Sequence, residues 1–181
     1  TYHRFGYGNM RDYPLADDKY AIEQLANRYD FIDINRVGIF GHSGGGFMAT
    51  AAICTHPDFY KAAVSSSGNH DNNIYNRGWV EIYNGVQEST KTIQTATGKD
   101  SIIYTFSSHV PTNMELAKNL KGHLLLVSGD QDRNVHPAHL LRMANALIQA
   151  NKNFEMLLIP GAKHGYTGQA NRFFEKKLWF H

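Results

Sequence analysis

The chain has 181 residues, of which 42% are hydrophobic and 19% are charged, and its formal net charge at pH 7 is +2. This length and hydrophobic content suit one folded domain and exclude a disordered chain. The near balance of charges, without a basic stripe, argues against nucleic-acid binding, and no apolar stretch is long enough to span a membrane.

The first third of the chain is predicted to hold two helices around one strand. Residues 1–15 are rich in glycine and aromatic residues and are expected to form a loop, with no methionine or signal-peptide core at its start. Apolar residues recur at helical spacing up to about Tyr29, after Asp17 or Asp18 as a candidate cap. A β-branched, apolar run over 36–40 predicts a strand, and the run 47–54 predicts a second helix.

Strands and helices alternate through the rest of the chain. The expected strands are 61–66, 123–129 and 154–159, and the expected helices are 114–120, one that starts at Pro137, and 172–180. This alternation predicts an α/β fold with a mostly parallel sheet and flanking helices. Between the first of these strands and helix 114–120, residues 67–113 are polar and irregular. We expect this insertion to shape a substrate pocket above the sheet edge.

Gly41-His42-Ser43-Gly44-Gly45 is the most informative stretch. It follows the strand 36–40 and precedes the helix 47–54, which is the strand, G-x-S-x-G, helix context of a nucleophile elbow. The small residues on either side of Ser43 would let the strand and helix approach closely. Ser43 would then stand at a helix N-terminus, where the Gly44 N–H and the helix dipole stabilise negative charge.

A serine nucleophile needs a base, and the base needs an acid that orients it. In this type of fold the chain order is Ser, then Asp or Glu, then His. Asp130 and Asp132 lie in the loop after strand 123–129, and His164 lies in the loop after strand 154–159. Since the carboxyl ends of parallel strands meet at one edge of the sheet, we expect the serine, one of these acids and the histidine to converge.

Four stretches together resemble the catalytic domain of the prolyl oligopeptidase family of serine peptidases, nearest to its dipeptidyl peptidase IV branch. They are Asp33–Ile39, Gly41–Gly46, Gly129–His136 and Lys163–Gly165. The resemblance implies an α/β-hydrolase fold. It also places the catalytic acid at Asp132 rather than Asp130, because the family's acid precedes the Asn of an Asn-Val-His run by two residues.

The resemblance further implies a pocket for proline at the cleavage site. Trp79 and Tyr83 stand at the positions that look like the family's aromatic pair, although their i, i+4 spacing would also suit a plain core stripe. Val135 would add an apolar wall, and Asn134 would touch the substrate backbone. Gly44 replaces a residue that is often tyrosine in the dipeptidyl branch, which would open the pocket and relax the preference for proline.

Members of this family also carry further sheet strands and a β-propeller, which would precede Thr1. We therefore expect residues 1–181 to form a single, partial catalytic domain that lacks the N-terminal strands. The family's second oxyanion donor, a tyrosine, would lie in the same preceding part. The strand 37–40 would then be an exposed edge, covered by those N-terminal segments or by a second chain.

These observations predict a serine peptidase that cuts after proline or a small residue near the substrate N-terminus, through an acyl-enzyme on Ser43. Two alternatives stay open: a carboxylesterase-type serine hydrolase, and an inactive hydrolase fragment that packs on a partner chain. The expected ligand is a peptide, with no metal or organic cofactor, because His136 and His139 lack a third ligand. The resemblance favours a periplasmic or secreted location. His42 is expected to pack beside the serine.

Overall fold

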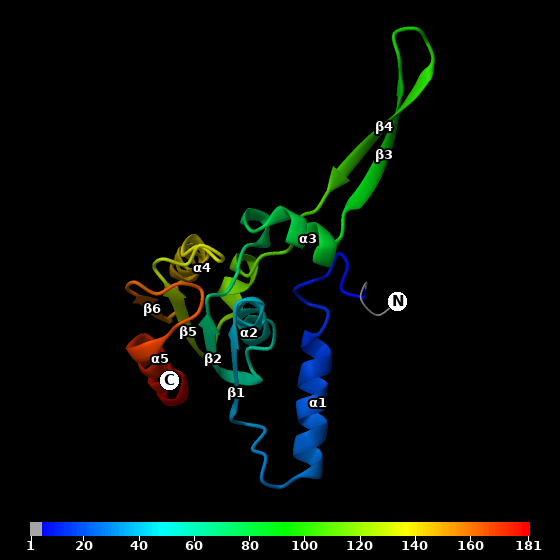
Figure 1. The fold of residues 1–181 in the computed structure, drawn as a ribbon. Helices are drawn as coiled ribbons and strands as arrows, with labels where there is room; N and C mark the ends of the chain where they lie inside the picture. Colours follow the sequence, from blue (N-terminus) through cyan, green and yellow to red (C-terminus); the bar gives the residue numbers. More distant parts are fainter. Residues whose placement is uncertain (1–4) are drawn as a thin grey trace.

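The structure is a computed structural model and describes residues 5–181. Helices and strands alternate along most of the chain, as Figure 1 shows. Their order is α1 (Leu15–Arg28), β1 (Val37–His42), α2 (Gly44–Thr55), β2 (Tyr60–Ser66), a 3₁₀ turn (Asn72–Ile74), α3 (Arg77–Asn84), β3 (Gln87–Gln94), β4 (Asp100–Ser107), a 3₁₀ helix (Met114–Asn119), β5 (His123–Gly129), α4 (Ala138–Gln149), β6 (Glu155–Ile159) and α5 (Gly168–Phe180).

Four strands form a parallel sheet in the order β1-β2-β5-β6. The chain leaves all four strands at the same edge, so the loops that start at Ser43, Ser67, Asp130 and Pro160 lie side by side. This arrangement explains how residues far apart in the sequence can share one site, because parallel strands repeat the same exit point.

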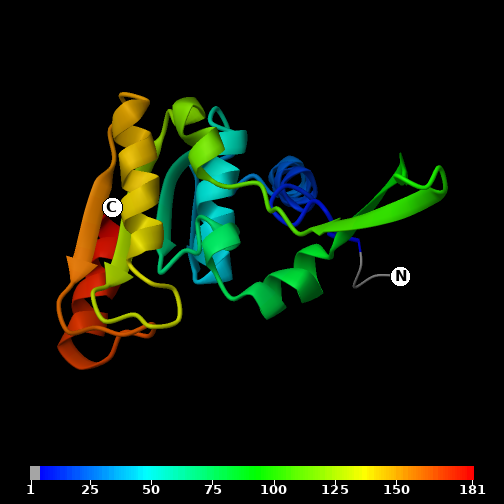
Figure 2. The same ribbon diagram turned by 90° about the horizontal axis from the view of Figure 1, so that it is seen from above.

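Each face of the sheet is covered by helices, which Figure 2 shows from above. On one face α2 packs against β2 and α4 against β5, with fully buried side chains such as Ile53, Leu126 and Leu147, and α1 and the 3₁₀ helix add side chains to the same hydrophobic cluster. On the other face α5 packs through Phe174 and Leu178. The near-continuous apolar run of β5 follows from this double cover, since a strand buried on both faces cannot alternate polar and apolar residues.

The segment 67–113 is more regular than the sequence suggested. Residues 77–84 form α3, whose cap is Asn76 accepting a hydrogen bond from the Trp79 N–H. Residues 87–107 form the antiparallel β3–β4 hairpin, which projects away from the body (Figure 1). The largely polar composition of the segment concealed both elements, although Ile102, Tyr104 and Phe106 alternate along β4. The parts on both sides of the hairpin return to the body, since the Asn113 side chain donates to the Phe47 carbonyl and the Asn113 N–H donates to the His70 carbonyl.

Other boundaries also differ from the sequence expectations. Helix α1 starts at Leu15, directly after Pro14, so no aspartate caps it, and Asp17 lies in its first turn instead. Helix α5 starts four residues earlier than expected, at Gly168. The predicted helix 114–120 is a 3₁₀ helix. The apolar pattern that located these helices includes neither Pro14 nor Gly168, so it placed both helix starts too late.

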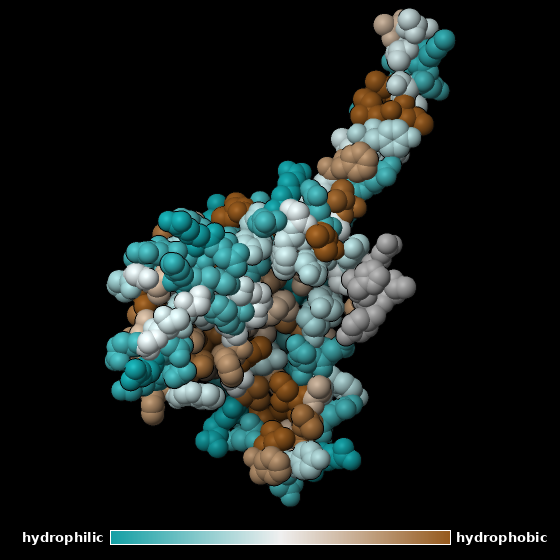
Figure 3. All heavy atoms as spheres, in the orientation of Figure 1, coloured by the Kyte–Doolittle hydropathy of each residue, from teal (hydrophilic) through white to brown (hydrophobic). Residues whose placement is uncertain are grey.

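Exposed apolar side chains occur at several places, among them the projecting hairpin and the edge of the sheet. Figure 3 shows hydrophobic side chains along the projecting hairpin, where Ile102, Tyr104 and Phe106 are all more than half exposed. At the sheet edge, β1 pairs with β2 alone among the described residues, and Phe40 of β1 is 60% exposed beside Trp179. The edge position of this strand agrees with the sequence expectation. No helix within residues 5–181 is long and apolar enough to cross a membrane.

Candidate active site

The tight turn between β1 and α2 presents Ser43 at the exit edge of the sheet. Its φ of 58° and ψ of −121° place a non-glycine residue in a rarely occupied region of backbone space. A Cβ on Gly41 would overlap the Gly45 carbonyl, and one on Gly46 would lie 2.7 Å from the Ser66 carbonyl oxygen. Glycine at these two positions therefore lets the strand, the turn and the helix pack closely enough to hold the serine in this strained conformation.

Ser43, His164 and Asp132 meet at this edge and form one chain of hydrogen bonds. His164 Nε2 lies 3.1 Å from Ser43 Oγ, and His164 Nδ1 lies 2.8 Å from Asp132 Oδ2. Asp132 is 1% exposed, and its Oδ1 accepts the N–H groups of Asn134 and Val135, each at 2.9 Å. With the carboxylate on Nδ1, the proton resides on that nitrogen, and Nε2 is left to accept the serine proton.

The neighbouring carboxylate Asp130 faces a different partner. Its Oδ1 accepts the backbone N–H of Gly161 at 2.6 Å, which ties the β5 loop to the β6 loop. Of the two acids in this loop, Asp132 is therefore the one in contact with the imidazole of His164.

An apolar cavity of about 800 Å³ opens beside the elbow. Gly44, Trp79 and Tyr83 line it, together with Phe47, Met48 and Tyr13. The Trp79 and Tyr83 rings lie 4.9 Å apart, so their i, i+4 spacing on α3 turns both toward the cavity beside Gly44. A Cβ on Gly44 would meet no atom within 4 Å, so this glycine leaves space at the mouth of the cavity.

Tyr75 belongs to the same cluster and was missed in the sequence. Its ring lies 5.4 Å from that of Trp79, and its hydroxyl donates to Asn134 Oδ1 at 2.8 Å. The signal that could have found it is the continued four-residue spacing from Tyr75 through Trp79 to Tyr83. Val135 is buried, with 1% exposure, and the contact we expect it to make with substrate stays a prediction.

The model for the prolyl oligopeptidase family of peptidases matches residues 1–180. The chain belongs to this family. Dipeptidyl peptidase 8 of Homo sapiens is 30% identical over 155 residues, which are 86% of this chain and 16% of that protein. Inactive dipeptidyl peptidase 10 of Mus musculus is 26% identical over 171 residues, 90% of this chain and 20% of that protein. The chain thus spans about a fifth or less of the length of these relatives.

The fold is that of an α/β-hydrolase, as the family resemblance implied. The crystal structure of Porphyromonas gingivalis dipeptidyl peptidase 4 superposes with a TM-score of 0.77 at 24% identity, and the match covers 97% of this chain and 23% of that one. One of the relatives is described as inactive, so family membership alone leaves open whether a given member is a catalyst. For this member of the prolyl oligopeptidase family, the geometry of the candidate active site bears on that question.

His42 packs against the imidazole of His164, which agrees with its expected packing role. The two rings lie 4.8 Å apart, and His42 Nδ1 lies 2.9 Å from Ser66 Oγ. Ser66 Oγ in turn donates to the Tyr166 hydroxyl at 3.0 Å. Partial burial, followed by the nearby His164, lowers the pKa of His42, so its ring is neutral at pH 7. Ser66 and Tyr166 therefore link the serine loop to the histidine loop, a role that no local sequence pattern marked.

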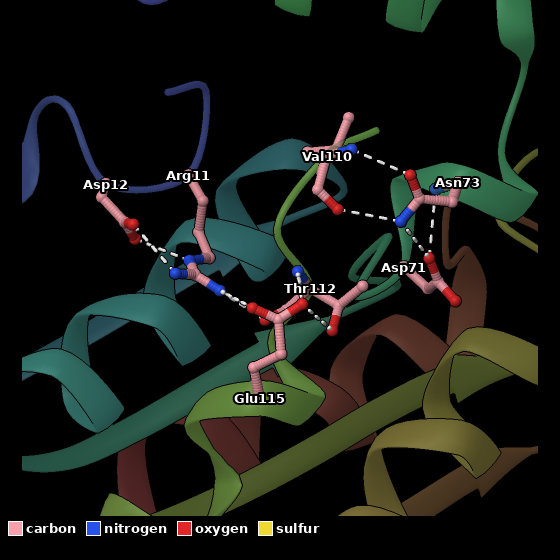
Figure 4. A network of polar contacts seen from close by, with 7 residues as sticks. All are labelled: Arg11, Asp12, Asp71, Asn73, Val110, Thr112 and Glu115. Carbon is pink, nitrogen blue, oxygen red and sulfur yellow. Dashed lines mark hydrogen bonds and ion pairs between the residues drawn. The ribbon is translucent and has the colours of Figure 1, made fainter. Parts of the chain in front are cut away.

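A polar network beneath the site holds the chain segments around residues 71 and 112 together (Figure 4). Arg11 reaches across from the N-terminal loop, donates to the Thr112 carbonyl at 2.6 Å and pairs with Glu115 at 3.3 Å. The Asn73 side chain accepts a hydrogen bond from the Val110 N–H and donates one to the Val110 carbonyl, each at 2.8 Å. These bonds fix the connection between the aromatic cluster on α3 and the core, because they satisfy polar groups that would otherwise be buried without partners.

Two histidines in this network are buried and neutral. Burial lowers the pKa of His70 to about 3 and that of His139 to about 4. His139 Nδ1 accepts the Asp71 N–H at 3.3 Å, and Asp71 pairs with Arg142 at 2.8 Å. No cluster of three potential metal ligands occurs within residues 5–181, and His139 acts as a hydrogen-bond acceptor in the core of this site.

Proposed function

We propose that this chain carries the catalytic triad of a serine peptidase. The chain of hydrogen bonds from Ser43 through His164 to Asp132 carries the proposal. Ser43 Oγ attacks the scissile carbonyl while His164 Nε2 takes its proton, and an acyl-enzyme forms as His164 returns that proton to the leaving amine. Water then attacks the ester by the same route. Asp132 holds the imidazole in the required tautomer and stabilises its charged form.

The negative charge that develops on the carbonyl oxygen would be stabilised by the Gly44 N–H. This group lies in the first turn of α2, where unpaired amides and the helix dipole favour an anion. The family resemblance implies a second donor from a tyrosine outside residues 1–181. Losing one such donor lowers the rate by roughly 10²–10³-fold, so we expect the chain by itself to be a poor catalyst.

We propose that the apolar cavity beside Gly44 receives proline or a small residue near the N-terminus of a peptide. Trp79, Tyr83 and Tyr75 offer flat apolar faces that suit a pyrrolidine ring, and Asn134 has an amide NH₂ group free to donate to the substrate backbone. The names of the dipeptidyl peptidase relatives support release of dipeptides. We further propose that the open β1 edge is covered by an N-terminal part of the same protein or by a second chain.

The test uses the protein expressed from its complete reading frame, with a dipeptide amide that ends in proline and a small activated ester as substrates. Ser43→Ala should abolish turnover of both. Tyr83→Ala should weaken turnover of the proline amide more than that of the ester, since the ester does not need the cavity. Equal losses on both substrates would indicate a folding effect. Ester turnover without amide turnover would favour the carboxylesterase alternative, and identical rates for the wild type and Ser43→Ala would favour an inactive module.

A further inference from the structure

A second cavity lies beside His164. It measures about 460 Å³ and is lined by Gln131, Arg133, Asn134, Lys163 and His164. The first three residues come from the loop after β5 and the last two from the loop after β6. The cavity therefore joins two loops that also supply the acid and the base of the triad, and it shares no lining residue with the apolar cavity beside Gly44.

Two of the five side chains that line this cavity end in cationic groups. Arg133 and Lys163 contribute a guanidinium and an ammonium group, and within residues 5–181 neither takes part in an ion pair. Asn134 also lines the cavity, but its NH₂ group is the one assigned above to the substrate backbone. Two positive charges beside one space suit an oxygen anion, because charge-assisted hydrogen bonds are stronger than neutral ones.

The two carboxylates of the β5 loop do not line the cavity, and each accepts hydrogen bonds elsewhere. Asp132 is buried and has both oxygens in hydrogen bonds to His164 and to two backbone N–H groups. Asp130 accepts from the Gly161 N–H. Arg133 and Lys163 are therefore both exposed beside the cavity without an ion-pair partner within residues 5–181.

The position beside His164 indicates which part of a substrate would enter. His164 must reach the leaving amine to protonate it, so the leaving group lies along the imidazole. The acyl part, by contrast, lies near Gly44 and the aromatic cavity. A group bound between Arg133 and Lys163 therefore belongs to the segment that follows the cut bond.

We propose that this cavity binds a carboxylate of the leaving segment of the peptide, and so favours substrates with negative charge directly after the scissile bond. The proposal rests on the proposed peptidase function and names its substrate class more closely. The carboxylate has two possible sources. It is the free C-terminus of a tripeptide, or the side chain of an acidic residue that follows the cut.

The experiment measures kcat/KM for two matched pairs of peptides with the complete reading-frame protein. Gly-Pro-Ala is compared with Gly-Pro-Ala-amide, which tests the free C-terminus, and Gly-Pro-Glu-amide is compared with Gly-Pro-Gln-amide, which tests an acidic side chain. We expect the carboxylate member of at least one pair to be favoured by roughly 3- to 10-fold at low salt, and the preference to shrink as salt is raised. The pair that shows it identifies the source.

Variants then assign the preference to the cavity. Arg133→Gln and Lys163→Gln should each reduce the ratio within the responding pair, and the double variant should abolish it. Lys91→Gln on the distant hairpin removes the same charge and should leave the ratio unchanged. Hydrolysis of all four peptides at equal rates would overturn the carboxylate site and leave the peptidase function standing. A preference that survives the double variant would also overturn it. Failure to hydrolyse any of them would overturn both proposals.

Discussion

Replacing Asp132 by asparagine should disable the site without unfolding it. Oδ1 of Asp132 accepts two backbone N–H groups at 2.9 Å, so the asparagine must keep its oxygen there and turn its NH₂ group toward His164. An NH₂ group opposite Nδ1 forces that nitrogen to accept, and the imidazole proton moves to Nε2. Nε2 then cannot take the proton of Ser43. A wrong tautomer of this kind lowers kcat by about 10⁴-fold, which corresponds to about 5.4 kcal/mol of transition-state stabilisation.

The assay follows turnover of a proline-containing dipeptide amide by the complete reading-frame protein, with circular dichroism to confirm that the variant folds. Asp130→Asn is the matched control, because it removes the same charge from the same loop while its oxygen still accepts the Gly161 N–H. We expect the control to retain activity within a few-fold. A folded Asp132→Asn protein with less than a tenfold loss would refute the assignment, as would a larger loss in Asp130→Asn.

Three further outcomes are expected. Gly41→Ala should yield no soluble, active protein, because its Cβ would overlap the neighbouring backbone. Gly45→Ala should fold normally, since its Cβ would meet no atom within 4 Å. Equal yields of soluble protein from the two variants would contradict this prediction. His42→Phe should keep kcat within about threefold, because it preserves an aromatic ring beside His164. His42→Asn should lower kcat about tenfold at an unchanged KM, because it removes that ring. A larger loss of kcat in His42→Phe than in His42→Asn would argue against ring packing. The pKa of His139 is lowered to about 4, so the unfolded chain takes up this proton first as the pH falls. The contribution of His139 to the free energy of unfolding should therefore be greatest above pH 6.5 and fall by about 1.4 kcal/mol per pH unit toward pH 4. Free energies of unfolding measured by urea titration at several pH values should depend less steeply on pH for His139→Gln than for the wild type.

Local patterns in the sequence predicted the parts of this protein that depend on neighbours in the chain. The apolar runs located all four strands of the parallel sheet, and the glycines around Ser43 located the elbow, because both follow from the backbone geometry of a few adjacent residues. The alternation of strands and helices then implied a shared exit edge. That edge is why His164 and one of the two aspartates after β5 could be expected beside the serine, while the family resemblance selected Asp132 over Asp130.

The same reasoning failed in the segment 67–113, whose overall polar composition was taken as irregular. Helix α3 and the β3–β4 hairpin carry short apolar patterns, such as Ile102, Tyr104 and Phe106 on β4, but these patterns face solvent or the neighbouring cavity and not the main core. Tyr75 was missed for a different reason. It lies outside α3, and its contacts with Trp79 and Asn134 form only when the loops fold together.

The sequence alone determined which chemical groups this protein can bring to one edge of a sheet, and in what order. Only the tertiary structure decided how those groups are used. Ser43 and His164 are 121 residues apart, and the parallel register of β1, β2, β5 and β6 sets the 3.1 Å between them. The same packing separates the aromatic cavity from the one that Arg133 and Lys163 line. Distances across strands depend on the packing of the whole core, which no short stretch of sequence contains.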